Sequence, residues 1–181
     1  GGGGGGNHIP LGEMAEIKRG TSITKKEIQP GKIPVIAGGR TPAYFHNISN
    51  RTGQTITIAG SGAYAGFVSF WEQPIFVSDA FTVKPRPGLI SKYCFYWLKN
   101  KQDHLHALKS GGGVPHVYPR NVAPLKIFIP PLSEQKRIVR ILDKFDTLTH
   151  SISAGLPREI ELRQKQYEYY RNQLLQFPAP K

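Results

Sequence analysis

A pair of prolines divides this sequence into two regions of different character. They end the apolar run "LKIFIPP" (125–131), and a new pattern begins at once with "LSEQKRIVRIL". Proline interrupts a strand because it lacks a backbone donor, and Ser133 is a favourable residue for capping a helix that follows. Glu134 and Gln135 suit the first turn of such a helix. We therefore expect one domain to end near residue 132 and a helix to start there.

Apolar residues recur at helical spacing after this boundary. The first stripe comprises Ile138, Ile141, Leu142, Phe145, Leu148 and Ile152. "AGLP" (154–157) interrupts it, with Gly155 placed to end one helix and Pro157 placed to open the next. The second stripe follows a seven-residue repeat with two positions per heptad and comprises Ile160, Tyr167, Leu174, Tyr170 and Phe177.

The two stripes predict a long antiparallel helical hairpin with coiled-coil character over residues 133–178. We interpret it as a spacer and dimerisation arm, because the aromatic-rich second helix has more apolar surface than one neighbouring helix covers. The residues expected at its interface are Ile141, Phe145, Leu148, Ile160, Tyr167, Tyr170, Leu174 and Phe177. The alternative is that both helices pack against the preceding domain.

Residues 8–132 predict a mixed, turn-rich domain that contains β-strands. Short runs rich in β-branched and aromatic residues end at Gly or Pro, which is typical of strands: "IPVIAGG" (33–39), "TITIAGSG" (55–62), "GFVSFW" (66–71) and "PIFVSDAFTVKP" (74–85). Apolar residues at helical spacing behind Ser91 predict a helix that ends at "SGGG" (110–113). Strands and helices that do not strictly alternate indicate an α+β fold.

The charge of the chain favours a polyanionic partner. The 181 residues carry a net charge of +12. Residues 1–132 hold 15 Lys and Arg against 6 Asp and Glu, whereas residues 133–181 hold 9 against 6. An excess of +9 on one domain is typical of a nucleic-acid-binding surface, and a merely solvated basic surface is the alternative.

The first residues, the single cysteine and the lack of long apolar runs bear on where the protein resides. The first six residues are glycines, so we assign residues 1–7 to a tag or linker and leave them out of the fold. The single cysteine, Cys94, lies in an apolar run and is expected to be a buried thiol, which fits a reducing prokaryotic cytoplasm. The sequence shows no signal peptide and no run long enough to span a membrane.

The sequence shows no persuasive catalytic or metal-binding constellation. His104 and His106 are two positions apart, so they point to different faces of a helix and are not expected to share a metal. "GSGAY" (60–64) lacks the Lys and Ser/Thr of a phosphate-binding loop and is interpreted as a glycine turn. Asp79 is expected to be a buried, hydrogen-bonded structural acid, because no second carboxylate or histidine accompanies it. We therefore predict no catalytic residue, no metal and no cofactor on this chain.

Candidate DNA contacts lie in four segments that we expect to be loops: 16–27, 38–47, 60–66 and 109–118. Their cations suit phosphates, their hydroxyls suit phosphates or base edges, and Arg and Asn can form paired hydrogen bonds with guanine and adenine. The candidates are Lys18, Arg19, Thr21, Ser22, Lys25, Lys26, Arg40, Tyr44, Asn47, Ser61, Tyr64, Lys109, Ser110 and His116. Ordinary turn residues with solvated charges are the alternative for any one of them.

The chain resembles the specificity subunit of Type I restriction-modification systems. The resemblance is carried by "LGEMAEIKRGTSITKKE", "IPVIAGGRTPAYFHN", "TITIAGSGAYAGFVSF" and "FVSDAFTV", and most specifically by "PPLSEQKRIVRILDKFDTL" and "EIELRQKQYEYYRNQLL". It implies a DNA target recognition domain over residues 8–132 and a helical spacer over residues 133–178. It also implies that the chain is not itself an enzyme and binds one half of a bipartite double-stranded DNA target.

The resemblance further implies partners. Methyltransferase subunits that use S-adenosylmethionine, and a restriction subunit that uses ATP and Mg²⁺, would assemble around the chain. A complete member of the family has two recognition domains and two helical regions, whereas this chain has one of each, so it is either a half-subunit or a fragment. Two copies joined through their helical arms would restore two half-sites. A free-standing dimeric DNA-binding regulator and a piece of a fused restriction-methylation enzyme are the alternatives.

Overall fold

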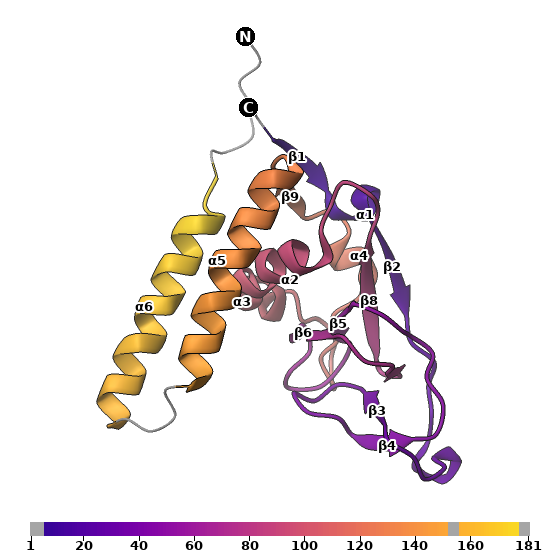
Figure 1. Ribbon diagram of the computed structural model, residues 1–181. Helices are drawn as coiled ribbons and strands as arrows, with labels where there is room; N and C mark the ends of the chain where they lie inside the picture. Colours follow the sequence, from indigo (N-terminus) through magenta and orange to yellow (C-terminus); the bar gives the residue numbers. More distant parts are fainter. Residues whose placement is uncertain (1–5, 152–155, 178–181) are drawn as a thin grey trace.

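The computed structural model describes residues 6–151 and 156–177, which form three small sheets flanked by helices (Figure 1). The largest sheet is antiparallel, in the order β2-β8-β5-β6. Its strands are β2 (Ala15–Arg19), β8 (Ala80–Pro85), β5 (Thr55–Ala59) and β6 (Val68–Trp71). Apolar side chains of this sheet, such as Ile56, Ile58 and Phe81, are buried in the core. The predicted strands at 55–62 and 66–71 therefore lie in the main sheet.

A second sheet lies at the far end of the domain from the helical pair. It has the order β4-β3-β7, in which β3 (Ile33–Ile36) pairs antiparallel with β4 (Tyr44–His46) and parallel with β7 (Phe76–Val77). The segment 74–85, predicted as strand, is divided between β7 and β8, which belong to different sheets. The chain changes sheets at Ser78 and Asp79, where the Ser78 N–H donates to the carbonyl of Ile36 at 2.8 Å.

Several short elements were not predicted from the sequence. β1 (Asn7–Pro10) pairs antiparallel with β9 (Lys126–Ile129), so Asn7, which we had assigned to the linker, faces Ile129. The helices α1 (Leu11–Met14) and α4 (Pro119–Val122) and the 3-10 turn η1 (Lys25–Glu27) are each a single turn. Such elements are set by distant partners, because their own residues carry no periodic pattern.

Two consecutive helices replace the one predicted between 91 and 109. These are α2 (Ser91–Asn100) and α3 (Gln102–Ala107), which pack on the main sheet and bury Leu98 and Leu105 completely. Ile90, not Ser91, occupies the N-cap position of α2. Cys94 is fully buried, as expected, and burial raises the pKa of its thiol.

The predicted helical hairpin is present as α5 (Leu132–Ser151) and α6 (Pro157–Leu175), which run side by side in opposite directions (Figure 1). Pro157 opens α6 as predicted. Helix α5 begins at Leu132, one residue earlier than the sequence suggested, because the Pro131 carbonyl accepts the N–H groups of Glu134 and Gln135. Ser133 is thus inside the first turn. Ile152 and Gly155 lie outside the described residues.

Helix α5 is part of the domain core, and α6 covers it and joins the same core near its C-terminal end, at Leu174 and Leu175. Ile138 and Leu142 of α5 have no exposed surface and belong to the same cluster as the sheet residues. Gln135 is also fully buried and makes three hydrogen bonds at the root of α5. Its side chain accepts from the N–H of Ile90 at 2.8 Å and donates to the carbonyls of Gly88 and Pro130 at 2.9 and 2.8 Å. Both interpretations of the helices are therefore partly confirmed: they form a hairpin, and its first helix packs on the domain.

The predicted interface residues of the hairpin find partners within this chain. The ring of Phe145 on α5 lies 6.1 Å from that of Tyr167 and 5.6 Å from that of Tyr170 on α6, measured between centroids. Phe177 stacks on Phe128 of β9 at 4.2 Å. Leu174 packs against the core, Ile141 and Ile160 are partly buried, and Leu148 is 56% exposed.

Candidate nucleic-acid interface

Two of the predicted contact loops, 60–66 and 109–118, are joined by backbone hydrogen bonds. The Gly62 N–H donates to the carbonyl of Pro115 at 2.9 Å. Gly62 and Gly66 have φ values of 88° and 93°, in the left-handed region that glycine accommodates at low cost. The interpretation of "GSGAY" as a glycine turn is confirmed, and the turn holds the second loop beside it.

The second loop closes on itself around His116. Ser110 and His116 exchange both backbone hydrogen bonds, at 3.0 and 2.9 Å, and His116 also forms a β-bridge with Ser61. The ammonium of Lys109 donates to the carbonyl of Ala63 at 3.2 Å. Four predicted contact residues from two loops, Ser61, Lys109, Ser110 and His116, are thus brought together.

The arginines of this region lie against aromatic rings. The guanidinium of Arg40 lies 4.7 Å from the ring centroid of Tyr64, which connects loop 38–47 to loop 60–66. Tyr118 has Arg120 at 4.1 Å and Arg19 at 5.8 Å, and its ring is stacked on His116 at 5.6 Å. Stacking on a ring limits the movement of a guanidinium and leaves its N–H groups available to a ligand.

Tyr118 and Arg120 join this cluster, although the sequence did not single them out as candidates. An aromatic residue two positions before an arginine, in "VYPR" (117–120), was the available signal, and it lies at the very end of the segment that was expected to carry the contacts. Aromatic residues interleaved with cations are a common feature of nucleic-acid surfaces.

Asp79 lies at the point where these segments meet. The Ser61 hydroxyl donates to Oδ2 of Asp79. A polar cavity of about 120 Å³ beside it is lined by Arg19, Gly20, Ser22, Gly60, Ser78, Asp79, Ala80 and Phe81. The prediction that Asp79 is hydrogen-bonded is confirmed, but the prediction that it is buried is wrong: the residue is exposed, because it occupies the bend between β7 and β8 rather than the interior of a strand.

We call the assembled surface the loop face. It comprises Arg19, Ser22, Arg40, Ser61, Tyr64, Asp79, Lys109, Ser110, His116, Tyr118 and Arg120. Thr21 borders it, with its backbone N–H bonded to the carbonyl of Val77 at 2.9 Å.

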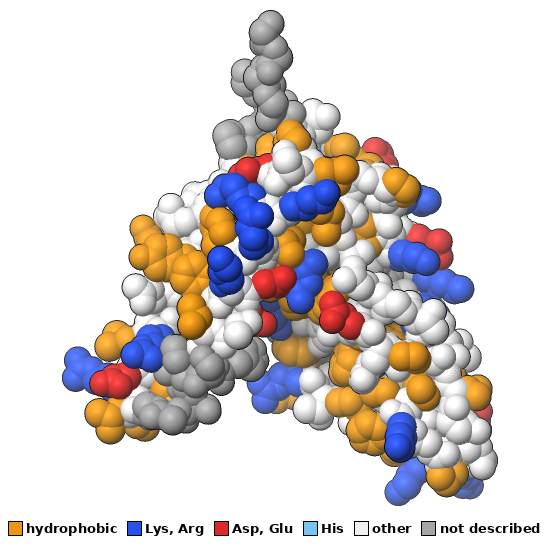
Figure 2. Space-filling model, viewed as in Figure 1, with side chains coloured by type: hydrophobic (Ala, Val, Ile, Leu, Met, Phe, Trp, Pro, Cys, Tyr) orange, Lys and Arg blue, Asp and Glu red, His pale blue; other side chains and the backbone are white. Residues whose placement is uncertain are grey.

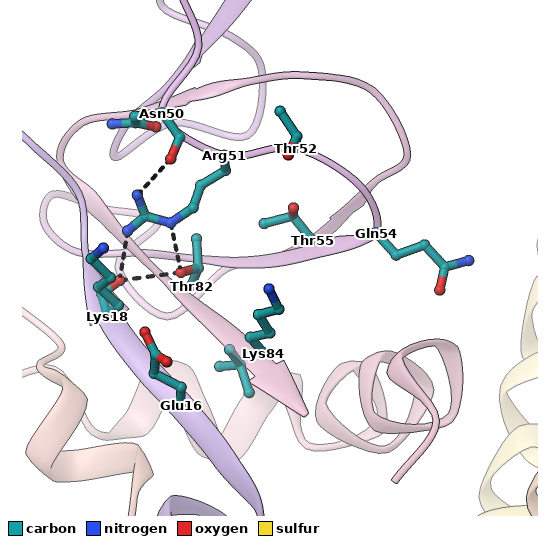
Figure 3. Close-up of a pocket in the computed structure, with 10 residues that line it drawn as sticks. Glu16, Lys18, Asn50, Arg51, Thr52, Gln54, Thr55, Thr82 and Lys84 are labelled. Atoms are coloured by element: carbon teal, nitrogen blue, oxygen red, sulfur yellow. Dashed lines mark hydrogen bonds between the residues drawn. The ribbon is translucent and has the colours of Figure 1, made fainter. Parts of the chain in front are cut away.

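Lys18 and Arg19, which were expected in one contact loop, line two different pockets. Both belong to β2 rather than to a loop, and neighbouring residues of a strand point to opposite faces. Arg19 lines the cavity beside Asp79, whereas Lys18 lines a separate polar pocket of about 240 Å³ with Glu16, Arg51 and Lys84 among its walls (Figure 3).

Arg51 stabilises the wall of the pocket beside Lys18 through hydrogen bonds. Its guanidinium donates to the hydroxyl of Thr82 at 3.1 Å and to the carbonyl of Asn50 at 2.9 Å (Figure 3). It also donates to the carbonyl of Arg19 at 2.9 Å. The Asn50 side chain in turn pairs with the backbone of Val77 in both directions, at 2.9 and 2.7 Å. These bonds occupy the cation, so we assign Arg51 a structural role.

The remaining candidates lie around the second sheet. Lys25 and Lys26 are exposed on η1, whose end is closed by Thr24 and Glu27, and the hydrogen bonds from Thr24 lower the pKa of the Glu27 carboxyl. Tyr44 and Asn47 are exposed at β4, and Tyr44 belongs to a strand rather than to a loop. The Gln29 N–H donates to His46 at 3.0 Å and so connects η1 to β4. These four candidates therefore form a group around the second sheet, apart from the loop face.

Cations are not confined to the first domain. On the face shown in Figure 2, Lys and Arg side chains gather over the upper part of α5, and hydrophobic side chains line the edge over α6. Among residues 6–151 and 156–177, no group of three or more His, Cys, Asp or Glu is arranged to hold a metal ion. Within the same ranges, no helix combines the length and apolar character needed to cross a membrane.

Known proteins are similar to this chain in sequence. The chain is 34% identical over 186 residues to a putative type I restriction enzyme specificity subunit of Haemophilus influenzae, which covers 93% of this chain and 48% of that protein. It is 50% identical over 104 residues to the type I restriction enzyme EcoR124I/EcoR124II specificity subunit of Escherichia coli, covering 56% of this chain and 26% of that protein. The chain thus spans at most about half the length of these two relatives.

Two solved structures show the same fold. The S subunit of a type I restriction-modification system from M. genitalium superposes with a TM-score of 0.73 at 23% identity, over 82% of this chain and 41% of that one. The HsdS subunit of Thermoanaerobacter tengcongensis gives a TM-score of 0.66 at 20% identity, over 94% and 45%. Residues 7–162 match the family described as the Type I restriction modification DNA specificity domain, and the chain belongs to that family.

Proposed function

We propose that this chain is a non-catalytic DNA-specificity module that binds one half of a bipartite double-stranded target through the loop face. The observation that carries the proposal is the convergence of strand β2 and three loops on one surface, where arginines are held on tyrosine rings. Stacked arginines suit guanine edges and phosphates, and hydroxyl groups beside them suit either.

The same proposal includes partners. Methyltransferase subunits supplied with S-adenosylmethionine, and a restriction subunit supplied with ATP and Mg²⁺, would provide the chemistry. A third solved structure with this fold concerns complex assembly of the type I restriction-modification system, which supports an assembling role for the fold. The helical hairpin is the surface we assign to these partners, and a prokaryotic cytoplasm is the compartment that the proposal requires.

A homodimer through α6 would supply the second half-site. Tyr167, Leu174 and Phe177 contact this chain's own residues, so the surface available to a second copy is the opposite side of α6. Leu162 and Tyr169, seven residues apart and therefore on one side of the helix, are 56% and 60% exposed. A twofold pair would present two identical recognition domains and bind an interrupted palindrome.

Selection from a pool of random duplexes tests the DNA-binding proposal. The chain should enrich one short motif, and its affinity should fall steeply with salt, because each neutralised phosphate releases counterions. Failure to enrich any motif would contradict the proposal, as would methyl transfer by the chain alone.

Sedimentation tests the dimer. Leu162→Glu should convert a dimer to a monomer at micromolar concentration, because it places a charge in an apolar contact. Gln164→Glu, on the other side of the same helix, adds the same charge at a polar, exposed position and should leave the dimer intact. A wild-type monomer would exclude this assembly.

A further inference from the structure

We propose that Asp79 and Ser61 form an acceptor pair that recognises the exocyclic amino group of one adenine or cytosine in the major groove. This inference rests on the proposed DNA-binding function and names the chemical group that one part of the loop face detects. It assigns a specificity role to a residue that was expected, from the sequence, to be structural.

The backbone that carries Asp79 is held by three other segments. The Gly60 N–H donates to the Asp79 carbonyl at 3.1 Å, and the Ser78 N–H donates to the Ile36 carbonyl at 2.8 Å. On the far side, the Gly20 N–H donates to the carbonyl of Ala80 at 2.9 Å. A carboxylate on so well fixed a bend loses little freedom when it binds a ligand, which favours recognition over a flexible surface contact.

Three glycines allow these segments to approach the bend. A β-carbon at Gly20 would lie 2.3 Å from the carbonyl oxygen of Val77, and one at Gly38 would lie 2.5 Å from that of Ser61. At Gly60 it would lie 3.0 Å from Oδ1 of Asp79 itself. The glycines therefore leave the carboxylate at the surface with close walls on its sides and the 120 Å³ cavity beside it.

The charge of Asp79 opposes the general attraction of this domain for phosphate. Asp79 is exposed within a domain of net charge +9, and among the described residues no Lys or Arg nitrogen lies within ion-pair distance of it. Such a carboxylate weakens non-specific binding to DNA. At a DNA surface, a carboxylate can interact favourably by accepting a hydrogen bond from a donor group of a base.

The hydrogen bond between the two side chains defines what they can detect. Because the Ser61 hydroxyl donates its proton to Oδ2 of Asp79, both side chains present only lone pairs to a ligand. In the major groove adenine N6 and cytosine N4 are donors, whereas guanine O6 and N7 and thymine O4 are acceptors. The pair should therefore accept adenine or cytosine at one position and reject guanine and thymine.

Duplexes that lack one amino group test this inference. In the motif enriched by the wild-type chain, each adenine is replaced in turn by purine and each cytosine by 2-pyrimidinone. At one position the loss of the amino group should weaken wild-type binding about tenfold, as expected for a hydrogen bond to a charged acceptor. The Asp79→Ala variant should bind the normal and the amino-lacking duplex equally at that position.

A second variant keeps the inference testable if Asp79→Ala does not fold. Asp79→Asn retains the shape but adds an amide donor, so it should accept guanine or thymine at the same position and leave the others unchanged. Asp103→Asn, which removes one charge from an exposed site on α3, should leave every position unchanged. If the wild-type chain enriches a motif but both Asp79 variants keep its full sensitivity to each amino group, this inference fails alone. If the wild-type chain enriches nothing, the proposed function fails as well.

Discussion

The loop face and the helical hairpin hold their functional side chains in place by different means. On the loop face, backbone hydrogen bonds join segments far apart in the sequence, and most of the side chains they carry remain exposed, whereas Ser61, His116 and Tyr118 are partly buried. In the hairpin, the side chains themselves form the contacts, through the buried stripe of α5 and the aromatic pairs between α5 and α6. Substitutions on the loop face should therefore change binding at little cost in stability, and substitutions in the hairpin should do the reverse.

The largest effect is expected at Leu142, which has no exposed surface. Leu142→Ala should lower the free energy of unfolding by about 3–5 kcal/mol, because it leaves a cavity in the core shared by α5 and the sheet. Leu156→Ala, at an exposed position just before α6, should cost less than about 0.5 kcal/mol. Urea denaturation of both variants measures the difference. Equal losses of unfolding free energy would mean that α5 does not belong to the core. The contrast between the hairpin and the loop face would then be wrong.

Gln135→Ala should have the next largest effect. It removes three hydrogen bonds and leaves the N–H of Ile90 without a partner, so we expect a loss of about 2–3 kcal/mol in the free energy of unfolding. Gln164→Ala, on exposed surface, is the matched control and should be neutral. DNA binding measured well below the unfolding temperature should be unchanged, and a lost sequence preference would contradict the separation of the two regions.

Arg19→Ala and Lys18→Ala sharpen the comparison within one strand. Arg19 faces the cavity beside Asp79 and Lys18 faces the opposite side, so Arg19→Ala should weaken DNA binding by about tenfold and Lys18→Ala by clearly less. Both should leave stability within about 0.5 kcal/mol, because Arg51 bonds only to their backbone carbonyls. Fluorescence anisotropy at a fixed salt concentration measures both affinities. Equal losses would mean that the whole strand lies against DNA.

Lys99, at the junction between α2 and α6, should give an effect that depends on pH. Its ammonium lies 4.0 Å from the ring of Phe67, and burial, with a smaller contribution from Arg171, lowers its pKa from 10.5 to about 8. Between these values the unfolded chain binds more protons at this site than the folded chain, so Lys99 makes the free energy of unfolding rise with pH. The Cys94 thiol acts in the opposite direction above its ordinary pKa of 9.0, since burial raises its folded value.

Lys99→Met isolates the lysine from the thiol. Relative to wild type, the variant should be most stable near pH 7 and should lose most of that advantage as the pH rises from about 8 to 10.5. Urea denaturation at several pH values measures this difference, with Lys101→Met, an exposed neighbour, as the control. A difference that does not change with pH would show that Lys99 titrates normally.

The sequence predicted the hairpin better than it predicted the loop face, and the reason is physical. The stripes of α5 and α6 repeat over five turns, so local residues are sufficient to indicate the helices. The same stripes do not indicate a partner: the seam of α6 was expected to meet a second copy, yet Tyr167 and Phe177 contact Phe145 and Phe128 of this chain.

On the loop face the residue types could be predicted, but their grouping could not. Lys18 and Arg19 are separated because successive side chains of a strand point to opposite faces. The position of Tyr118 depends on a loop that is closed by the backbone hydrogen bonds between Ser110 and His116. Asp79 is exposed because the chain passes from one sheet to another between β7 and β8. The apolar residues on either side of Asp79 do not indicate this change of sheet.

The buried amide of Gln135 also sets an angle. Helix α5 ends at Ser151, 16 residues beyond Gln135, and therefore extends about 24 Å from the point where that side chain is bonded. A tilt of about 10° at this root would move the far end by about 4 Å, nearly the rise of three residues along the helix. The three hydrogen bonds of Gln135 thus lie at the end of the helix about which it would tilt. The position of the distal end of the hairpin relative to the loop face therefore depends on the geometry of one glutamine together with the packing of Ile138 and Leu142.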